Sequence, residues 1–166
     1  MAGLLISINA FSVVNVGQSP KNVVLSGEKG SLVKGGDWDS SSLKGKVHVV
    51  FYVDPDENES NEGVIAALKQ AAFPKDKFGT VAIINMDATW MPNIAIESKL
   101  KDRQKKFPDT TYVKDFKKIL VKEWGLKDDA FDVMVFDASG KIIYGFEGPM
   151  PKQEIARMVD FVKASL

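Results

Sequence analysis

The chain has 166 residues, with 22 lysines and arginines against 22 aspartates and glutamates, so its formal net charge is zero. Net neutrality argues against the broad positive field that drives non-specific nucleic-acid binding, and we expect no nucleic-acid partner. There is no cysteine and only one histidine, His48. This excludes thiol nucleophiles, CxxC redox pairs, cysteine-ligated metals and multi-histidine metal sites within one chain.

The N-terminal segment, residues 1–14, differs from the rest. Residues 3–8 are apolar, and residues 10–12 have the small-x-small form of a signal-cleavage site, but no positively charged region precedes them. The segment is therefore either the remnant of an export signal or an N-terminal strand. We expect residues 15–166 to form a single domain, because this length suffices to bury a full core. No later stretch approaches the roughly 18 apolar residues needed to span a bilayer, so no transmembrane segment is predicted.

The first predicted elements lead from strands into a helix. Residues 23–25 and 31–33 flank a glycine-rich turn and predict an N-terminal β-hairpin. Residues 47–53 form a nearly continuous apolar, β-branched and aromatic run, which is typical of a strand buried on both faces. Apolar residues then recur at helical spacing over residues 61–73, and Pro74 ends that helix.

The later part of the chain continues the alternation of strands and helices, with helix stops at Pro108 and Gly125. The predicted elements are a strand at 81–86, a helix marked by residues 96, 100 and 107, a short strand at 110–114, a short helix at 116–124, a hairpin of 133–136 and 142–144, and a helix at 151–165. This order predicts an α/β fold with a mixed β-sheet and helices on both faces, which is the element order of thioredoxin.

Short motifs along the chain resemble known proteins. Those at residues 42–47, 122–126 and 135–142 resemble motifs of peroxiredoxin-type members of the thioredoxin-like superfamily. A further ordered series lies at residues 38–40, 43–47, 71–78, 83–88, 96–98 and 105–108. It resembles the YtfJ-type family of exported bacterial thioredoxin-like proteins, whose function is unknown. The resemblance implies a thioredoxin-like fold and a periplasmic location, and it supplies no established reaction.

Both redox elements of a thioredoxin are replaced. A CxxC pair would open the helix after the first core strand, where the helix N-terminus lowers a thiol pKa. That place is taken by an acidic loop at 54–62, with Asp56 and Glu59 near the cysteine positions. The resemblance also implies a cis-proline before the late strand, where Ala130 or Phe131 stands instead. Because carboxylates cannot exchange disulfides, we expect neither a thiol–disulfide oxidoreductase nor a thiol peroxidase.

The acidic loop has three open interpretations. It can cap the following helix through Asn58, Ser60 or Asn61, with its carboxylates near the positive helix end. Asp54, Asp56 and Asn58 also have the D-x-D-x-N form that begins a calcium-binding loop. That pattern then fails, because Glu59 stands where the loop needs glycine and no glutamate stands at its last position.

The third interpretation is acid–base catalysis. Asp56 and Glu59 could form a carboxylate pair, with an acidic partner at residue 128, 129 or 132 across the cleft. The alternative is that these are solvated loop acids with ordinary pKa values.

Two further features indicate binding surfaces. Trp90 and Met91, in the loop after the second core strand, could anchor a partner or fill a crevice beside the sheet. One helix carries a basic face, which is either a solvated surface or a site for an anionic partner such as a lipid headgroup or an acidic protein. Its basic residues are Lys99, Lys101, Arg103, Lys105 and Lys106.

The sequence therefore predicts a redox-inactive thioredoxin-like binding or interaction module, placed in a bacterial periplasm by the family resemblance. Its candidate binding residues are Asp54, Asp56, Glu59, Trp90 and Phe131. An unidentified protein is the expected partner, and no cofactor is predicted. The alternatives are a thiol-independent enzyme that uses the loop carboxylates and a structural protein that binds a divalent cation.

Overall fold

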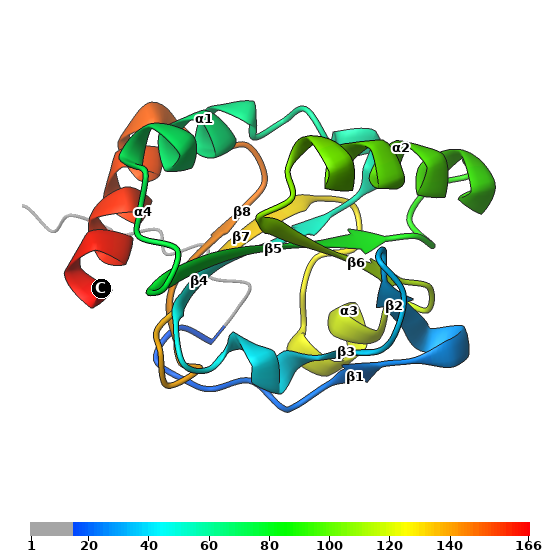
Figure 1. Cartoon of the computed structure of the whole chain (residues 1–166), viewed down its shortest axis with the longest axis horizontal. Coiled ribbons are helices and arrows are strands. Elements are labelled where there is room, and N and C mark those ends of the chain that lie inside the picture. The colour runs from blue at the N-terminus through cyan, green and yellow to red at the C-terminus, as the bar shows by residue number, and fades with distance from the viewer. Residues whose placement is uncertain (1–14) are drawn as a thin grey trace, which may run out of the picture.

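A computed structural model describes residues 15–166, and its centre is a mixed six-stranded sheet (Figure 1). The predicted export-signal remnant or strand at 1–14 lies outside the described residues. In spatial order the strands are β2 (Gly30–Leu32), β6 (Thr110–Asp115), β5 (Phe78–Asn85), β4 (Val47–Val53), β7 (Phe131–Phe136) and β8 (Ile142–Glu147). The β4–β5 and β5–β6 pairs are parallel, and the other neighbours are antiparallel.

Helices cover both faces of this sheet, as predicted. One face carries α1 (Glu62–Ala71), α2 (Asn93–Lys106) and α4 (Lys152–Ser165). The other face carries α3 (Ile119–Trp124) and a two-stranded sheet of β1 (Val24–Leu25) and β3 (Trp38–Asp39) (Figure 1). No helix within residues 15–166 is long and apolar enough to cross a bilayer.

Strand β4 lies at the centre and separates two hydrophobic cores. Val49 and Phe51 point toward α1, α2 and α4, whereas Val50 and Tyr52 point toward α3. This alternation follows from the two-residue period of a strand, and it confirms the prediction that residues 47–53 are buried on both faces.

The predicted N-terminal hairpin is wrong in its pairing. Both segments contain strands, but β1 pairs with β3 and β2 pairs with β6 at the edge of the main sheet. A 3₁₀ turn at Gly27–Lys29 redirects the chain between the two partners. Gly30 then approaches β6 so closely that a Cβ atom there would lie 2.1 Å from the carbonyl oxygen of Lys114.

The other predicted elements are present, with shifted bounds. Helix α1 ends at Ala71 rather than 73, because Ala72 is left-handed with φ of 47°. Strand β5 begins at Phe78 rather than 81, because its first residues pair in parallel with β4 although they include glycine and threonine. Helix α3 begins at Ile119 rather than 116, after a left-handed Lys118.

Candidate functional site

The carboxyl ends of β4, β5 and β6 meet at one edge of the sheet, where the antiparallel β7 begins. Ligands of open α/β sheets bind outside this edge. Three loops converge there in this chain: the acidic loop at 54–61, the loop at 86–92 after β5, and the loop at 125–130 before β7.

Asp54 fixes the start of the acidic loop. Its backbone N–H donates to the carbonyl of Ala130 at 2.9 Å, and its carboxylate accepts from the N–H of Asp56, also at 2.9 Å, which caps a 3₁₀ turn. The side chain is buried, and burial together with the charges of Asp56 and Asp129 raises the pKa of Asp54. Asp54 therefore joins the loop to the start of β7.

Asn61 clamps the other end of the loop. It directly precedes α1, but its side chain makes no hydrogen bond that caps the helix, so the prediction of capping is wrong for Asn61. Its amide donates instead to the carbonyls of Gly148 at 3.0 Å and Phe131 at 3.4 Å, and its oxygen accepts from the N–H of Met150 at 2.9 Å. This buried residue ties α1 to β7 and to the turn before α4.

Asp56 and Glu59 are exposed at the surface of this loop, whereas the neighbouring Asn58 is half-buried. Within residues 15–166 no three histidine, cysteine or acidic side chains lie together as a metal-binding group. The cation site at Asp54, Asp56 and Asn58 and the acid–base pair of Asp56 and Glu59 stay predictions.

Ala130 and Phe131, one of which is predicted to replace the cis-proline, lie directly before and at the start of β7. No peptide bond among the described residues is cis. Phe131 is buried, and its ring meets that of Phe51 edge to face with centroids 5.4 Å apart. It lines a groove between α1 and α2, to which Pro55 and Met91 at this edge also contribute.

Trp90 projects from the loop after β5. Its side chain is 91% exposed, and Ile94 in the first turn of α2 is 84% exposed. Met91 between them is half-buried and packs against the core. The structure thus places an apolar pair at the same edge as the acidic loop.

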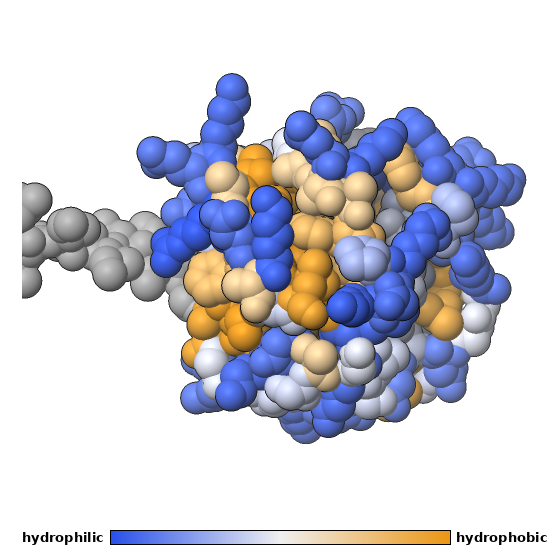
Figure 2. Space-filling view, turned by 60° about the vertical axis from the view of Figure 1, so that its left-hand side comes forward, coloured by the Kyte–Doolittle hydropathy of each residue, from blue (hydrophilic) through white to orange (hydrophobic). Residues whose placement is uncertain are grey.

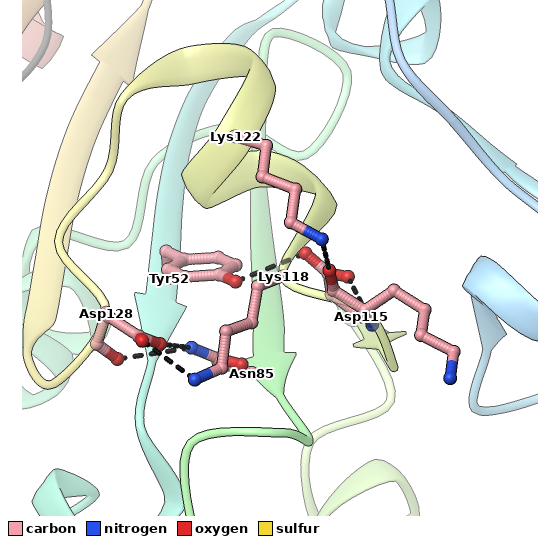
Figure 3. A network of polar contacts seen from close by, with 7 residues as sticks. Tyr52, Asn85, Asp115, Lys118, Lys122 and Asp128 are labelled. Carbon is pink, nitrogen blue, oxygen red and sulfur yellow. Dashed lines mark hydrogen bonds and ion pairs between the residues drawn. The ribbon is translucent and has the colours of Figure 1, made fainter.

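A row of buried polar side chains on the α3 face of the sheet could not be identified from the sequence alone. Four adjacent strands each contribute one such residue on this face, at the strand end or one residue inside it: Tyr52, Asn85, Asp115 and Asp132. Figure 3 shows most of this network. Asp115 accepts from the Tyr52 hydroxyl at 3.1 Å and from the N–H groups that begin α3, including that of Ile119 at 2.9 Å. It therefore holds α3 against the sheet.

Asp128 and Asp132 serve this row and not the acidic loop. Asp128 accepts from Asn85 at 2.8 Å and from Lys118 at 2.7 Å (Figure 3). Burial raises the pKa of Asp128, but these two donors outweigh burial and hold the pKa below its ordinary value. Asp132 accepts one bond, from the N–H of Lys127 at 3.1 Å, and burial raises its pKa to about 7. The charge of Asp129 raises the pKa of Asp54, and an acidic partner for Asp56 and Glu59 stays a prediction.

His48 has a structural environment. Its Nδ1 atom lies 3.1 Å from the carbonyl oxygens of both Leu43 and Lys46, and its ring covers Gly79 of β5. Burial lowers the pKa of His48. The ring therefore joins the chain before β4 to the sheet.

The fold is that of a thioredoxin-like protein, and the absence of cysteine from the sequence excludes thiol chemistry. Similar solved structures are a putative thiol:disulfide interchange protein DsbE from Chlorobium tepidum (TM-score 0.65, 15% identity, 92% of this chain and 98% of that chain) and the exposed lipoprotein thioredoxin Etrx1 from Streptococcus pneumoniae strain TIGR4 (TM-score 0.60, 16% identity, 85% and 99%). At such identities the likeness shows the fold alone, and it confirms the predicted thioredoxin-like class.

The chain belongs to the family described as "Bacterial protein of unknown function (YtfJ_HI0045)", whose family model matches residues 9–165. It is 26% identical over 132 residues to the uncharacterized protein YtfJ of Escherichia coli strain K12, a match that covers 78% of this chain and 72% of that protein. The resemblance found in the sequence motifs is thus confirmed.

Proposed function

We propose that this chain is a thiol-independent binding module on a thioredoxin scaffold, and that it takes a protein partner at the sheet edge where Trp90 projects. The observation that carries the proposal is the exposure of this residue. Trp90 and Ile94 are the two most exposed large apolar side chains within residues 15–166. Tryptophan is enriched among the residues that dominate binding energy, because its large ring gains most when a partner removes it from water.

The acidic loop supplies the charge of this surface. Asp56, Glu57 and Glu59 are exposed at the same edge of the sheet, and no basic residue occurs between residues 54 and 62. Charged residues at the rim of an interface steer association and select partners of opposite charge. We therefore propose a partner segment that combines an apolar anchor with basic residues.

We further propose that the module acts outside the cytoplasm, in the periplasm. Two observations support this location: the motifs resemble an exported family, and one similar solved structure is described as an exposed lipoprotein. Fractionation of the native bacterium, with an antibody against the chain, tests the location. Recovery in the cytoplasmic fraction alone would contradict it.

Crosslinking pull-downs from the native periplasm test the binding role. We expect one reproducible crosslinked protein with the wild-type chain and its loss in the Trp90→Ala variant. The matched control is Val24→Ala, which removes a side chain that is 43% exposed on β1, on the α3 face of the sheet. Equal capture by all three proteins would overturn the assignment of the surface, and reduction of insulin disulfides by the pure chain would overturn its thiol-independent character.

A further inference from the structure

The groove between α1 and α2 has a volume of about 890 Å³ and an apolar floor. It exists because α1 packs against α4 and α2 packs on β6, so the two helices do not close over the sheet between them. The floor is built from Phe51, Val53, Ala82 and Ile84 of β4 and β5. A volume of this size falls in the range of roughly 300–1,000 Å³ that is typical of small-molecule sites.

Apolar surface also reaches solvent on this side of the molecule. Figure 2 views the molecule from the side that carries α1 and α4, and it shows hydrophobic surface between hydrophilic side chains there. The combination of apolar surface and surrounding charge suits a ligand that is itself amphipathic.

The rim of the groove is basic. Asp109 is its one acidic lining residue within residues 15–166, and that carboxylate already pairs with Lys75 at 2.7 Å. Lys99, Arg103 and Lys106 follow one another on α2 at the three- and four-residue spacing of a single helix face. Among the described residues none of these three has a carboxylate within 4.0 Å. Their charges are therefore available to a ligand.

Tyr112 adds an unused donor beneath this rim. Its side chain lines the groove and is only 6% exposed, and within residues 15–166 its hydroxyl makes no hydrogen bond. Burial raises the pKa of Tyr112, and the positive charge of Arg103 lowers it. A phenol hydroxyl without an intramolecular partner can donate to the acceptor of a ligand in the groove.

We propose that this groove binds a single-chain amphipathic carboxylate of the fatty-acid class. The alkyl chain lies over the floor between the two helices, and the carboxylate meets Arg103, Lys99 and the Tyr112 hydroxyl. The apolar floor selects a long hydrocarbon, and the basic rim selects an anionic head over a neutral or cationic one.

The matched side chains on α2 allow a sharp test. Sodium dodecanoate, kept below its micelle threshold at pH 8, is titrated into the whole chain by calorimetry. We expect saturable binding at one site, weakened at least about tenfold by Arg103→Glu or Lys99→Glu. Lys101→Glu makes the same charge change on the same helix outside the groove lining, and binding is expected to stay within about twofold of wild type.

Two further arms separate the head from the chain. Dodecyltrimethylammonium has the same alkyl length with a cationic head, and it is expected to bind at least about tenfold more weakly. Ile65→Trp, which enlarges a half-buried side chain of the groove wall, is expected to abolish dodecanoate binding, whereas Gln70→Trp on the exposed side of α1 keeps it. Far-UV circular dichroism establishes that each variant is folded.

Several results would overturn the proposal. They are the absence of saturable heat, equal losses in Lys99→Glu and Lys101→Glu, equal affinity for the cationic amphiphile, or binding to phosphatidylglycerol vesicles without binding to dodecanoate. The groove site stands independently of the proposed protein partner, since the titration uses neither Trp90 nor a second protein.

Discussion

Replacement of Asp132 by asparagine is predicted to change how the free energy of unfolding depends on pH. The Asp132 side chain is 1% exposed, and one of its oxygens has no hydrogen-bond partner within residues 15–166. Burial, opposed by the single bond from the Lys127 N–H, raises its pKa from 3.8 to about 7. Between these two values the folded state binds more protons than the unfolded state, so stability is lost as pH rises through this window.

The magnitude follows from the size of that pKa change. At about 1.36 kcal/mol for each pKa unit, ionised Asp132 costs the folded state roughly 4 kcal/mol, of which roughly 3 kcal/mol develops between pH 4.5 and pH 8.5. The asparagine of Asp132→Asn does not ionise and can still accept the Lys127 N–H, but its amide introduces donors that cost about 1–3 kcal/mol if they find no acceptor. The variant is therefore expected to be less stable than wild type at pH 4.5 and more stable at pH 8.5.

Urea unfolding at several pH values measures this difference. Trp38 and Trp124 are buried, with ring centroids 6.5 Å apart, so their fluorescence reports on the core beside Asp132. The free energy of unfolding of the variant is subtracted from that of the wild type at each pH. This difference removes the contributions of two other groups that both proteins share: Asp54, whose pKa is also raised by burial, and His48, whose pKa is lowered by burial, so that its contribution to stability changes with pH in the opposite direction. A stability difference that is the same at pH 4.5 and pH 8.5 would refute the reasoning.

Two further changes test the frame of the site. Asn61→Ala leaves the Met150 N–H and the Gly148 carbonyl without their Asn61 partner, so we expect it to lower the free energy of unfolding by about 2–4 kcal/mol. The control Asn58→Ala is expected to lower it by less than about 1 kcal/mol. Equal losses for the two variants in urea unfolding would contradict the structural role of Asn61. Gly30→Ala places a Cβ atom against the Lys114 carbonyl, whereas the Cβ atom of Gly27→Ala meets no other described atom within 4 Å. We expect Gly30→Ala to lower the melting temperature by several degrees more than Gly27→Ala. A smaller shift for Gly30→Ala than for Gly27→Ala in a thermal melt would contradict the close approach of β2 to β6.

Local sequence patterns predict most elements of the fold because their signals are local. The apolar, β-branched run at 47–53 is typical of a strand buried on both faces, and the helical spacing before Pro74 predicts one buried stripe of α1. Strand pairing is different, because β1 and β2 have two and three residues and carry no mark of their partners. The sequence therefore predicts a hairpin between neighbours, whereas the structure pairs each segment with a more distant strand.

The sequence predicts the candidate site in outline only. The acidic loop and Trp90 follow from composition and from their place after a strand. The polar row of Tyr52, Asn85, Asp115 and Asp132 does not, since each residue alone resembles an ordinary strand end. What these residues share is that their side chains all point to the same face of the sheet. This common face can be recognised only once the order of the strands is known.

Site-specific photocrosslinking in the native bacterium tests the central claim most directly. A photoreactive residue replaces Trp90 in one strain and Lys163, exposed on α4, in another. A thioredoxin scaffold that binds through this sheet edge should give one discrete crosslinked partner from position 90 and none from position 163. Crosslinks of equal yield and pattern from both positions, or none from position 90, would contradict it.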